Sequence, residues 1–477
     1  MHIYFMGIGG TAMGSVAILL KQQGHAISGV DLNVYAPMSD RLRNAGIEFF
    51  EGFDAERLAA QQPDLVVVGN VIGRGNPEAE WLLETRCLPF VSLPQLIGEH
   101  LIGHRPSIVI TGTHGKTTTT ALTTHLLLES GANPGYLIAG VPASDLPSSA
   151  MGSADTPFVI EGDEYDCAFF DKRSKFIHYF PRTLIINNLE FDHGDIFRDL
   201  EDIIRSFQHL LRLVPQSGNI LINGDDPKLL EWVSREAYST LWKVGFEAHN
   251  DLQILDFEEH SNGSHFRLQL HGRPWLQVSW PLAARYNARN AAMAALATGL
   301  QIDPAHPDSF LSPESFTRFR GVMRRQQVLF SNEKLLLVED FGHHPTAIGE
   351  TLVSFRNRFP GHRIWAVFEP RSNTSRSPAF QQLWPVTLAH ADEVWIGAIH
   401  RLHLLDASKR LNTRQLKTDL EDRGTPTHLF ESNAELQHCL LSQLANVTSP
   451  LLVLFFTNGS FDGIMQASVC EAQRLNR

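Results

Sequence analysis

A short glycine turn that ends in Lys-Thr constrains the fold of this chain more than any other feature of its sequence. The apolar run 107–111 suits a buried strand, and the run 117–130 has the composition of a helix that ends at Gly131. A glycine turn between a strand and a helix points backbone N–H groups at an anion, because the first N–H groups of a helix have no partner within it. The stretch therefore predicts a phosphate-binding loop in an α/β domain. A glycine- and threonine-rich turn that holds no ligand is the alternative.

The residues of this loop suit the phosphates of a nucleotide. Lys116 would place its charge against the β- and γ-phosphates, and the Thr117 hydroxyl would ligate Mg²⁺. Only Thr113 and His114 separate the two glycines of the loop, so its spacing is shorter than the common GxxxxGK[ST] pattern. The predicted loop residues are Gly112, Thr113, His114, Gly115, Lys116, Thr117 and Thr118.

Length and charge narrow the class of protein. A chain of 477 residues is too long for one core and suggests three domains of about 100 to 200 residues each. The net charge of −12 argues against a broad surface for nucleic acid or anionic membrane, and no apolar run reaches the roughly 18 to 20 residues of a membrane span. We expect a cytoplasmic protein that acts on small molecules as a monomer or a weak homo-oligomer, with neither nucleic acid nor membrane as a partner.

The sequence offers no pattern typical of a disulfide framework or a zinc site. Its four cysteines, at positions 87, 167, 439 and 470, lie far apart and form no CxxC pair. His343 and His344 are adjacent, but neighbouring side chains generally point in different directions, and no Cys or acidic residue stands near them at metal-ligand spacing. We therefore expect buried or incidental thiols and no structural metal at the histidine pair.

Residues 1–105 follow the order of a Rossmann-like domain. A strand at 2–5 runs into a glycine turn, a helix follows at 15–23, and a second strand ends in Asp31. A later strand leads to a loop that begins with Asn70, at the sheet edge where such folds bind ligands. The glycine pattern by itself fits a dinucleotide, a different nucleotide or no ligand. The candidate ligand contacts are Gly7, Gly9, Gly10, Asp31 and Asn70.

The predicted central domain, residues 106–327, gathers acidic residues after the phosphate loop. The strand that starts at Phe158 ends in Glu161, and a second strand at 183–187 is followed by a polar run that ends in His193. Parallel strands bring their carboxyl ends to one edge of a sheet, so both polar runs would face the phosphates. We predict Glu161 as a ligand of Mg²⁺ and His193 as a residue that reaches a second ion. Solvated acidic loops are the alternative.

The same domain should also contain an antiparallel part and a helix of small residues. The run 251–280 alternates enough for antiparallel strands, and the run 288–300 suits the helix. Asn287 and Asn290 are three residues apart and therefore share a helix face. Exposed asparagines on a helix commonly have no function.

The last part, residues 328–477, has α/β character without a second phosphate loop. Strands are expected at 334–338, 363–368, 393–396 and 451–456, with a polar or glycine-containing loop after each. The predicted fold class is therefore α/β with three domains: a Rossmann-like N-terminal domain, a central phosphate-loop ATPase domain with a parallel sheet and a small antiparallel part, and a Rossmann-like C-terminal domain.

Taken in order, six segments resemble the cytoplasmic Mur ligases, three-domain enzymes that form amide bonds at the expense of ATP in peptidoglycan synthesis. The segments are GIGGTAMG, TGTHGKTTT, EGDEYD, NNLEFDH, NxxN and DFGHHPT, and the resemblance spans essentially the whole chain. GIGGTAMG and DFGHHPT are similar to the branch that uses UDP-N-acetylmuramate, whose first domain holds the sugar nucleotide. The runs 163–176 and 369–374 resemble the members of this branch that accept a tripeptide.

The resemblance implies an activity and its cofactors. UDP-N-acetylmuramate would be joined to L-alanyl-γ-D-glutamyl-meso-diaminopimelate through an acyl phosphate, with ATP and Mg²⁺. A ligase that joins UDP-N-acetylmuramate to L-alanine is the alternative within the family. A nicotinamide-dependent oxidoreductase would explain only the N-terminal glycine turn, and a transport or switch ATPase only the phosphate loop.

The resemblance also implies roles for single residues. Lys116 and Thr117 match residues of the phosphate loop, and Glu161 and His193 match metal ligands. His344 matches a histidine that faces the phosphates. The matches to nucleotide contacts are Asn287, Asn290, Arg325, Asp340 and Phe341. Arg371, in the run 369–374, is expected to receive carboxylates of the peptide, with Arg376, Arg401, Lys409 and Arg410 as further candidates.

The chain departs from the family pattern at two places. Tyr286 stands where relatives often have His, and Gln327 stands where many have Glu, so the contacts to adenine are in doubt. Some Mur ligases carry a carbamoylated Lys a short distance after the metal-binding histidine. Residues 194–212 contain no Lys and Gln208 lies near that position, so we predict no carbamate.

Overall fold

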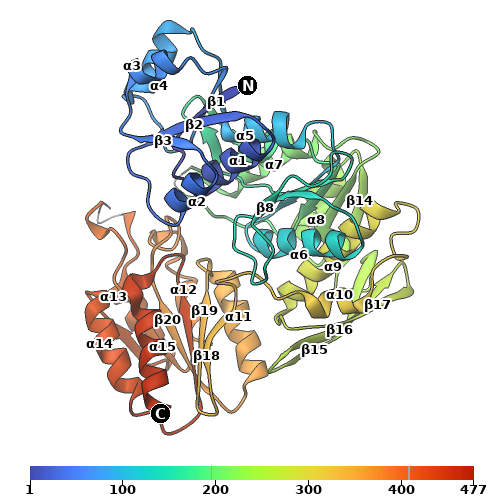
Figure 1. Cartoon of the computed structure of the whole chain (residues 1–477). Helices are drawn as coiled ribbons and strands as arrows, with labels where there is room; N and C mark the ends of the chain where they lie inside the picture. The colour runs from blue at the N-terminus through green and yellow to red at the C-terminus, as the bar shows by residue number, and fades with distance from the viewer. Residues whose placement is uncertain (195, 405, 407–408, 477) are drawn as a thin grey trace.

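Three large sheets organise the part of the chain that the computed structural model describes, residues 1–194, 196–404, 406 and 409–476. Each sheet belongs to a separate stretch of the chain, and the three stretches form three lobes (Figure 1). None of the helices in the described ranges combines the length and the apolar composition that a bilayer crossing requires.

The first sheet has the order β3-β2-β1-β4-β5 and is parallel throughout. The strand order reverses between β1 and β4, which opens a crevice at their carboxyl ends. The strands are β1 (His2–Met6), β2 (Ala26–Asp31), β3 (Glu48–Glu51), β4 (Leu65–Val68) and β5 (Phe90–Ser92). The helices are α1 (Thr11–Gln22), α2 (Met38–Asn44), α3 (Ala55–Gln61), α4 (Pro77–Thr85), α5 (Leu93–Leu96) and the π-helix η1 (Ile97–Ile102).

The central sheet has the order β17-β16-β15-β14-β13-β12-β6-β9-β7-β8. It is parallel from β15 to β7 and antiparallel at both edges. Its strands are β6 (Ser107–Thr111), β7 (Gly135–Leu137), β8 (Ser149–Ala150), β9 (Phe158–Glu161), β12 (Thr183–Ile186), β13 (Asn219–Asn223), β14 (Thr240–Gly245), β15 (Leu252–His260), β16 (Gly263–Leu270) and β17 (Arg273–Trp280).

Helices and a small hairpin complete the central lobe. The two residues His271 and Gly272 form the tight turn between β16 and β17. Both have a positive φ, +46° and +78°, and a two-residue turn of this kind matches the twist of the strands that it joins. The helices are α6 (Lys116–Glu129), α7 (Leu200–Leu211), α8 (Pro227–Glu236), α9 (Arg285–Ile302) and α10 (Pro313–Arg318). The hairpin consists of β10 (Asp166–Ala168) and β11 (Asp171–Ser174), and the 3₁₀-helix η2 (Lys175–His178) follows it.

The third sheet has the order β18-β19-β23-β20-β21-β22, with only β18 antiparallel to its neighbour. Its strands are β18 (Gln327–Ser331), β19 (Leu335–Asp340), β20 (Arg363–Phe368), β21 (Glu393–Ile396), β22 (Thr427–Leu429) and β23 (Leu451–Phe456). The helices are α11 (Pro345–Arg358), α12 (Trp384–Leu388), α13 (Thr413–Glu421), α14 (Asn433–Leu444) and α15 (Ile464–Leu475), with 3₁₀ turns at Pro378–Phe380, Leu402–Leu404 and Phe461–Gly463.

Polar contacts attach the third lobe to the antiparallel edge of the central sheet. Glu259 of β15 accepts hydrogen bonds from Ser354 Oγ at 2.5 Å and Asn357 Nδ2 at 3.1 Å, both on α11. Arg358 of the same helix donates to the carbonyls of His260 and Ser261, each at 3.1 Å. The antiparallel strands therefore serve as an attachment surface for α11.

The predicted α/β class is confirmed, and the differences lie at element ends. The first helix begins at Thr11, directly after the glycine turn, and α9 begins three residues before the expected start. The stretch 93–102 is not one regular α-helix but a short α5 continued by a π-helix. The strand β18 begins at Gln327, the last residue assigned to the central domain, because it pairs with β19 rather than with the central sheet.

We predict that Gly98→Ala destabilises the contact between the first and central lobes. An ideal Cβ at Gly98 would lie 2.1 Å from the carbonyl oxygen of His178 in η2, and a backbone oxygen cannot move aside by a change of rotamer. Overpacking of this kind costs about 1–3 kcal/mol, so the thermal unfolding midpoint should fall by several degrees. Gly361→Ala is the matched control, since its Cβ would meet nothing within 4 Å. Equal midpoints for the two variants in scanning calorimetry would contradict the prediction.

Candidate active site

One cavity of about 860 Å³ is bounded by all three lobes. The carboxyl ends of parallel strands from three sheets face it, which is where α/β folds bind ligands. Its walls include Gly7, Gly10, Asn70 and Leu93 from the first lobe, the phosphate loop, Glu161, His193, Asn287 and Arg325 from the central lobe, and Asp340, Phe341, His343 and His344 from the third.

The phosphate loop has the conformation that its glycines permit. Gly112 and Gly115 have φ of +122° and +82°, and a Cβ on Gly115 would lie 2.7 Å from Asn290 Oδ1. Lys116 Nζ donates to the carbonyl of Gly112 at 2.6 Å and pairs with Glu164 Oε2 at 3.2 Å. Burial alone would lower the pKa of Lys116, but the charges of Glu164 and Asp163 outweigh burial and raise it. The loop therefore presents a fixed positive charge to the cavity.

Thr117 and Glu161 form a site that suits a hard cation. The Thr117 hydroxyl donates to Glu161 Oε2 at 2.9 Å, and the N–H of Ala139 donates to Glu161 Oε1 at 2.8 Å. Burial raises the pKa of Glu161, so its carboxylate gains from a cation beside it. A hydroxyl and a carboxylate are oxygen ligands of the kind that Mg²⁺ prefers. The predicted pair of ligands thus lies together, and its donor set fits the ion.

His193 belongs to a second cluster whose acidic partners the sequence analysis did not single out. Its Nε2 lies 3.1 Å from Glu164 Oε1, and ligand atoms of Asp163, Glu164 and His193 all lie within 4.8 Å of one another. His193 has a φ of +55°, in the left-handed region. Burial alone would lower the pKa of His193, but the hydrogen bond to Glu164 and the charge of Asp192 raise it. These groups could hold a second ion.

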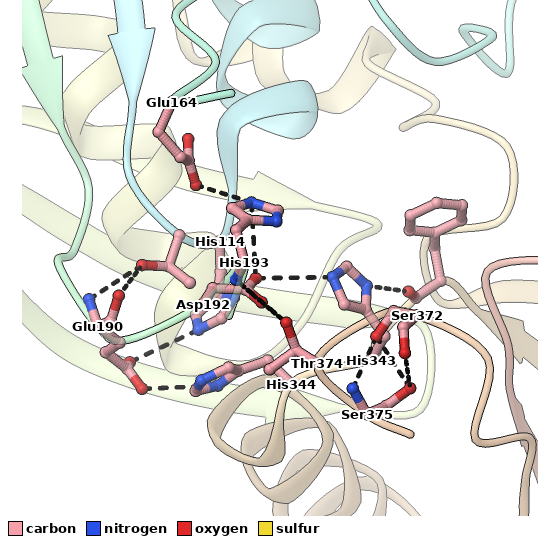
Figure 2. A network of polar contacts seen from close by, with 12 residues as sticks. His114, Glu164, Glu190, Asp192, His193, His343, His344, Ser372, Thr374 and Ser375 are labelled. Carbon is pink, nitrogen blue, oxygen red and sulfur yellow. Dashed lines mark hydrogen bonds and ion pairs between the residues drawn. The ribbon is translucent and has the colours of Figure 1, made fainter. Parts of the chain in front are cut away.

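The loop after β20 is tied to the residues beside this cluster (Figure 2). Thr374 donates from its hydroxyl to the Asp192 carboxylate and accepts from the N–H of His193 at 3.1 Å. His343 Nε2 lies 3.8 Å from Asp192 Oδ2. Burial would raise the pKa of Asp192, but His343 and His193 lower it far below the usual range. The third lobe therefore holds the turn that carries the candidate metal ligand.

His344 joins the third lobe to the phosphate loop through Glu190 (Figure 2). Its Nδ1 accepts from the N–H of Thr346 at 3.3 Å at the start of α11, and its Nε2 donates to the carbonyl of Phe191 at 3.2 Å. The rings of His114 and His344 are 4.5 Å apart. Burial, and next the neighbouring His114, lower the pKa of His344 to about 4. His344 is therefore neutral near pH 7, with both ring nitrogens engaged.

The residues matched to nucleotide contacts lie on α9 and on the loops around Asp340. Asn287 Nδ2 donates to the carbonyl of Ala283 at 2.7 Å, and Asn290 Nδ2 donates to Asn287 Oδ1 at 3.2 Å. The Arg325 guanidinium lies 4.7 Å from the centre of the Phe341 ring. Burial raises the pKa of Asp340 although Arg325 opposes it. This group forms one wall of the cavity beside the phosphate loop.

The two departures from the family pattern have different positions. Tyr286 lines the cavity, and its hydroxyl accepts from Gln326 Nε2 at 2.6 Å. Gln327 accepts from the N–H of Arg324 at 2.7 Å and is not part of the cavity wall. Gln208, near the position where some Mur ligases are expected to carry a lysine, lies on α7 and is also outside the wall. Only Tyr286 therefore changes the surface that a ligand meets.

Three candidate substrate contacts make internal contacts and lie outside the cavity wall. Asp31 accepts from the N–H of Gly9 at 3.0 Å and so ties the glycine turn to β2. Arg371 lies 3.4 Å from Glu369 Oε1 and 3.1 Å from His400 Nδ1, in the third lobe. These contacts explain how the side chains are held, and the roles of Gly9, Asp31 and Arg371 toward a substrate stay predictions.

The cysteines form no disulfide: Cys167 is buried and the other three are exposed. Cys167, Asp171 and His178 lie close enough to share an ion. Arg173, however, already donates two hydrogen bonds to Asp171, at 2.9 and 2.8 Å, so a cation would compete with a guanidinium there. This cluster is therefore a poor candidate for a metal centre.

Comparison with known proteins defines the class. Residues 2–105 match the catalytic domain of the Mur ligase family, and residues 110–298 match the Mur ligase middle domain. The chain belongs to the Mur ligase family.

Particular relatives narrow the comparison. The chain is 42% identical over 397 residues, covering 83% of this chain and 84% of the relative, to the UDP-N-acetylmuramate–L-alanyl-gamma-D-glutamyl-meso-2,6-diaminoheptandioate ligase of Escherichia coli. It is 37% identical to the Haemophilus influenzae ligase of the same name, with 98% of both chains covered. The crystal structure of a murein peptide ligase from Psychrobacter arcticus superposes with a TM-score of 0.69 at 31% identity, covering 99% and 98%. A UDP-N-acetylmuramate–L-alanine ligase of Chlorobaculum tepidum is 32% identical over 84% of this chain and 80% of its own.

We predict that His344 makes stability depend on pH between about 6.5 and 4. The unfolded side chain takes up a proton near 6.5, the folded one only near 4, so the unfolded state binds more protons in this window and stability falls as pH falls. The full loss is about 3 kcal/mol. His344→Asn keeps a side chain that can cap α11 but removes the titration, so its urea unfolding midpoint should change less over this window. His306→Asn, an exposed position, is the control. Equal pH dependence in wild type and His344→Asn would contradict the assignment.

Proposed function

We propose that this protein is an ATP-dependent amide ligase that joins UDP-N-acetylmuramate to L-alanyl-γ-D-glutamyl-meso-diaminopimelate in peptidoglycan recycling. The observation that carries the proposal is the single cavity shared by the first-lobe glycine turn, the phosphate loop and the Asp340–His344 loop. Three substrates must meet for this reaction, and each lobe supplies one wall. The relatives named for the tripeptide support the choice of amine.

The reaction begins with a carboxylate, which is a poor electrophile until it is activated. Transfer of the γ-phosphoryl group of ATP to the lactyl carboxylate gives an acyl phosphate and ADP. Two anions must approach each other, and Lys116 offers a fixed charge at the point of approach. Mg²⁺ held by Thr117 and Glu161, with a second ion near His193, would supply further positive charge there.

The free amine of the peptide then attacks the acyl carbon. The tetrahedral intermediate collapses to the amide and releases phosphate, and the proton leaves the amine. Thr374 holds the His193 turn from the third lobe, so the site is complete only when this lobe is in place. This closure would keep water away from the acyl phosphate.

The proposal extends to domains, contacts and location. We assign residues 1–105 to the sugar nucleotide, 106–327 to ATP and 328–477 to the peptide. Asn287, Asn290, Arg325, Asp340 and Phe341 would hold the nucleotide, and Gly7, Gly10 and Asn70 the sugar nucleotide. We place the reaction in the cytoplasm, where ATP is available, and expect a monomer or a weak homo-oligomer.

A UDP-N-acetylmuramate–L-alanine ligase is the second candidate, because relatives of that name are 32% and 31% identical over 84% and 98% of this chain. It differs from the first candidate only in the amine. An oxidoreductase or a transport ATPase would leave either the Lys116 loop or the first and third lobes unused.

We predict that Lys116→Ala lowers turnover by roughly 100-fold or more while the protein remains folded, because the side chain neutralises charge that develops during phosphoryl transfer. Phosphate release with all three substrates measures turnover, and circular dichroism checks the fold. Lys228→Ala, an exposed lysine on α8, is the matched control and should keep full activity. Near-normal turnover in folded Lys116→Ala would remove Lys116 from the mechanism.

We predict that the tripeptide is a far better acceptor than L-alanine. Its three carboxylates have to dock on a protein with a net charge of −12, so local arginines should receive them. Arg371→Ala should raise KM for the tripeptide by roughly tenfold and leave KM for UDP-N-acetylmuramate nearly unchanged. Arg363→Ala is the control. Arg363 is the first residue of β20 and so lies at the opposite end of that strand from the loop that carries Arg371. Faster phosphate release with L-alanine than with tripeptide would favour the second candidate.

A further inference from the structure

Lys175 lies at the junction of the first and central lobes and faces the cavity. It opens η2, and its ammonium lies 2.5 Å from Asp163 Oδ2 and 5.7 Å from the centre of the Tyr165 ring. The mechanism described so far does not use this side chain. It comes from a different element than Lys116, so the two lysines approach the cavity from separate segments.

Asp163, the partner of Lys175, belongs to the Asp163–Glu164–His193 cluster that could hold an ion. An ion bound in this cluster would therefore compete with the Lys175 ammonium for the Asp163 carboxylate. A divalent ion attracts a carboxylate more strongly than an ammonium does at equal distance, because the Coulomb energy scales with charge. The ion pair is partly exposed, with 26% of the Lys175 side chain and 32% of the Asp163 side chain accessible. Burial would raise the pKa of Asp163, but the charges of Lys175 and Lys116 lower it to about 2, so an ion that displaces Lys175 must attract this carboxylate at least as strongly.

The cavity wall beside Lys175 is largely apolar. The helix α5 of the first lobe packs against η2 and β10 and contributes Leu93 and Pro94 to the wall. Cys167 and Tyr179 are buried beside the same elements. The Lys175 ammonium thus lies on an apolar wall between the first lobe and the phosphate loop. It can donate charge-assisted hydrogen bonds to one carboxylate of a ligand that reaches from the first lobe to the phosphate loop.

We propose that Lys175 binds the carboxylate of the sugar nucleotide that becomes the amide, after Asp163 exchanges Lys175 for a divalent ion. This inference rests on the proposed function, since it concerns the orientation of that substrate. Asp163 holds the ammonium in place until the ion binds, and Lys175 then turns toward the substrate. Lys175 is thus a substrate-binding residue whose availability depends on the ion.

The experiment compares two sugar nucleotides that differ in the carboxylate. Titration calorimetry without ATP measures the affinity for UDP-N-acetylmuramate and for UDP-N-acetylglucosamine, which lacks the lactyl group, with and without saturating Mg²⁺. In wild type, the preference for the muramate should rise by about tenfold when Mg²⁺ is added. In Lys175→Met the preference should be lost in both conditions. Lys172→Met is the matched control, because Lys172 lies on β11, three residues before Lys175, is largely exposed and pairs with Asp166 at 2.6 Å.

Asp163→Asn provides a second variant that leaves Lys175 in place. Without the pairing carboxylate, this protein should prefer the muramate even when Mg²⁺ is absent. It also tests the proposal if Lys175→Met does not fold.

The outcomes separate the two levels of inference. A wild-type protein that fails to bind UDP-N-acetylmuramate would overturn the proposed function itself. Normal binding in wild type with an unchanged preference in Lys175→Met, or with equal changes in Lys172→Met, would overturn only the role of Lys175. A preference that Lys175→Met loses but that never depends on Mg²⁺ would overturn the exchange at Asp163.

Discussion

The ion pair between Lys116 and Glu164 is the interaction on which the rest of the site depends. Burial would lower the pKa of the partly buried Lys116 ammonium, but the nearby carboxylates of Glu164, Asp163 and Glu161 raise it. Carboxylates gathered in this way repel one another, and they would repel ATP and a sugar nucleotide even more. Lys116 is the first residue of α6, where N–H groups that have no partner within the helix add to its positive charge. This combined charge allows the cavity to bind anions.

The sequence alone was enough to predict the α/β class, the glycine turn between β6 and α6, and the placement of Thr117 and Glu161 at the same edge of the sheet, while their roles toward a nucleotide and an ion stay predictions. Each of these features comes at the end of a strand or directly after one, and buried strands can be recognised in the sequence as short apolar runs. The carboxyl ends of parallel strands lie at the same edge of a sheet, so residues at these ends are expected to lie close together. Glu161 is the last residue of β9, so its position is set by the strand itself.

Other parts of the site could not be predicted in the same way. Asp163 and Glu164 lie beyond the end of β9, where no periodicity indicates which side chain faces His193. The contact of Thr374 with Asp192 joins residues 182 positions apart, and nothing local in the sequence indicates it. For Asp31, the sequence correctly predicted a position at the end of β2. Its contact with the Gly9 N–H could not be predicted, because that contact depends on the shape of the glycine turn.

The left-handed backbone of His193 restricts which mutational paths are open to this enzyme. Left-handed φ is tolerated by glycine and, less well, by asparagine, aspartate and histidine, whereas β-branched residues are strained there. Of these four, only aspartate and histidine are common metal ligands, and aspartate would add a fourth carboxylate to the cluster with Asp163 and Glu164 beside Asp192. For the candidate ion site at this position, few single-residue replacements of the imidazole are therefore open, and a different ligand would require the turn to be rebuilt together with the Thr374 contact that holds it.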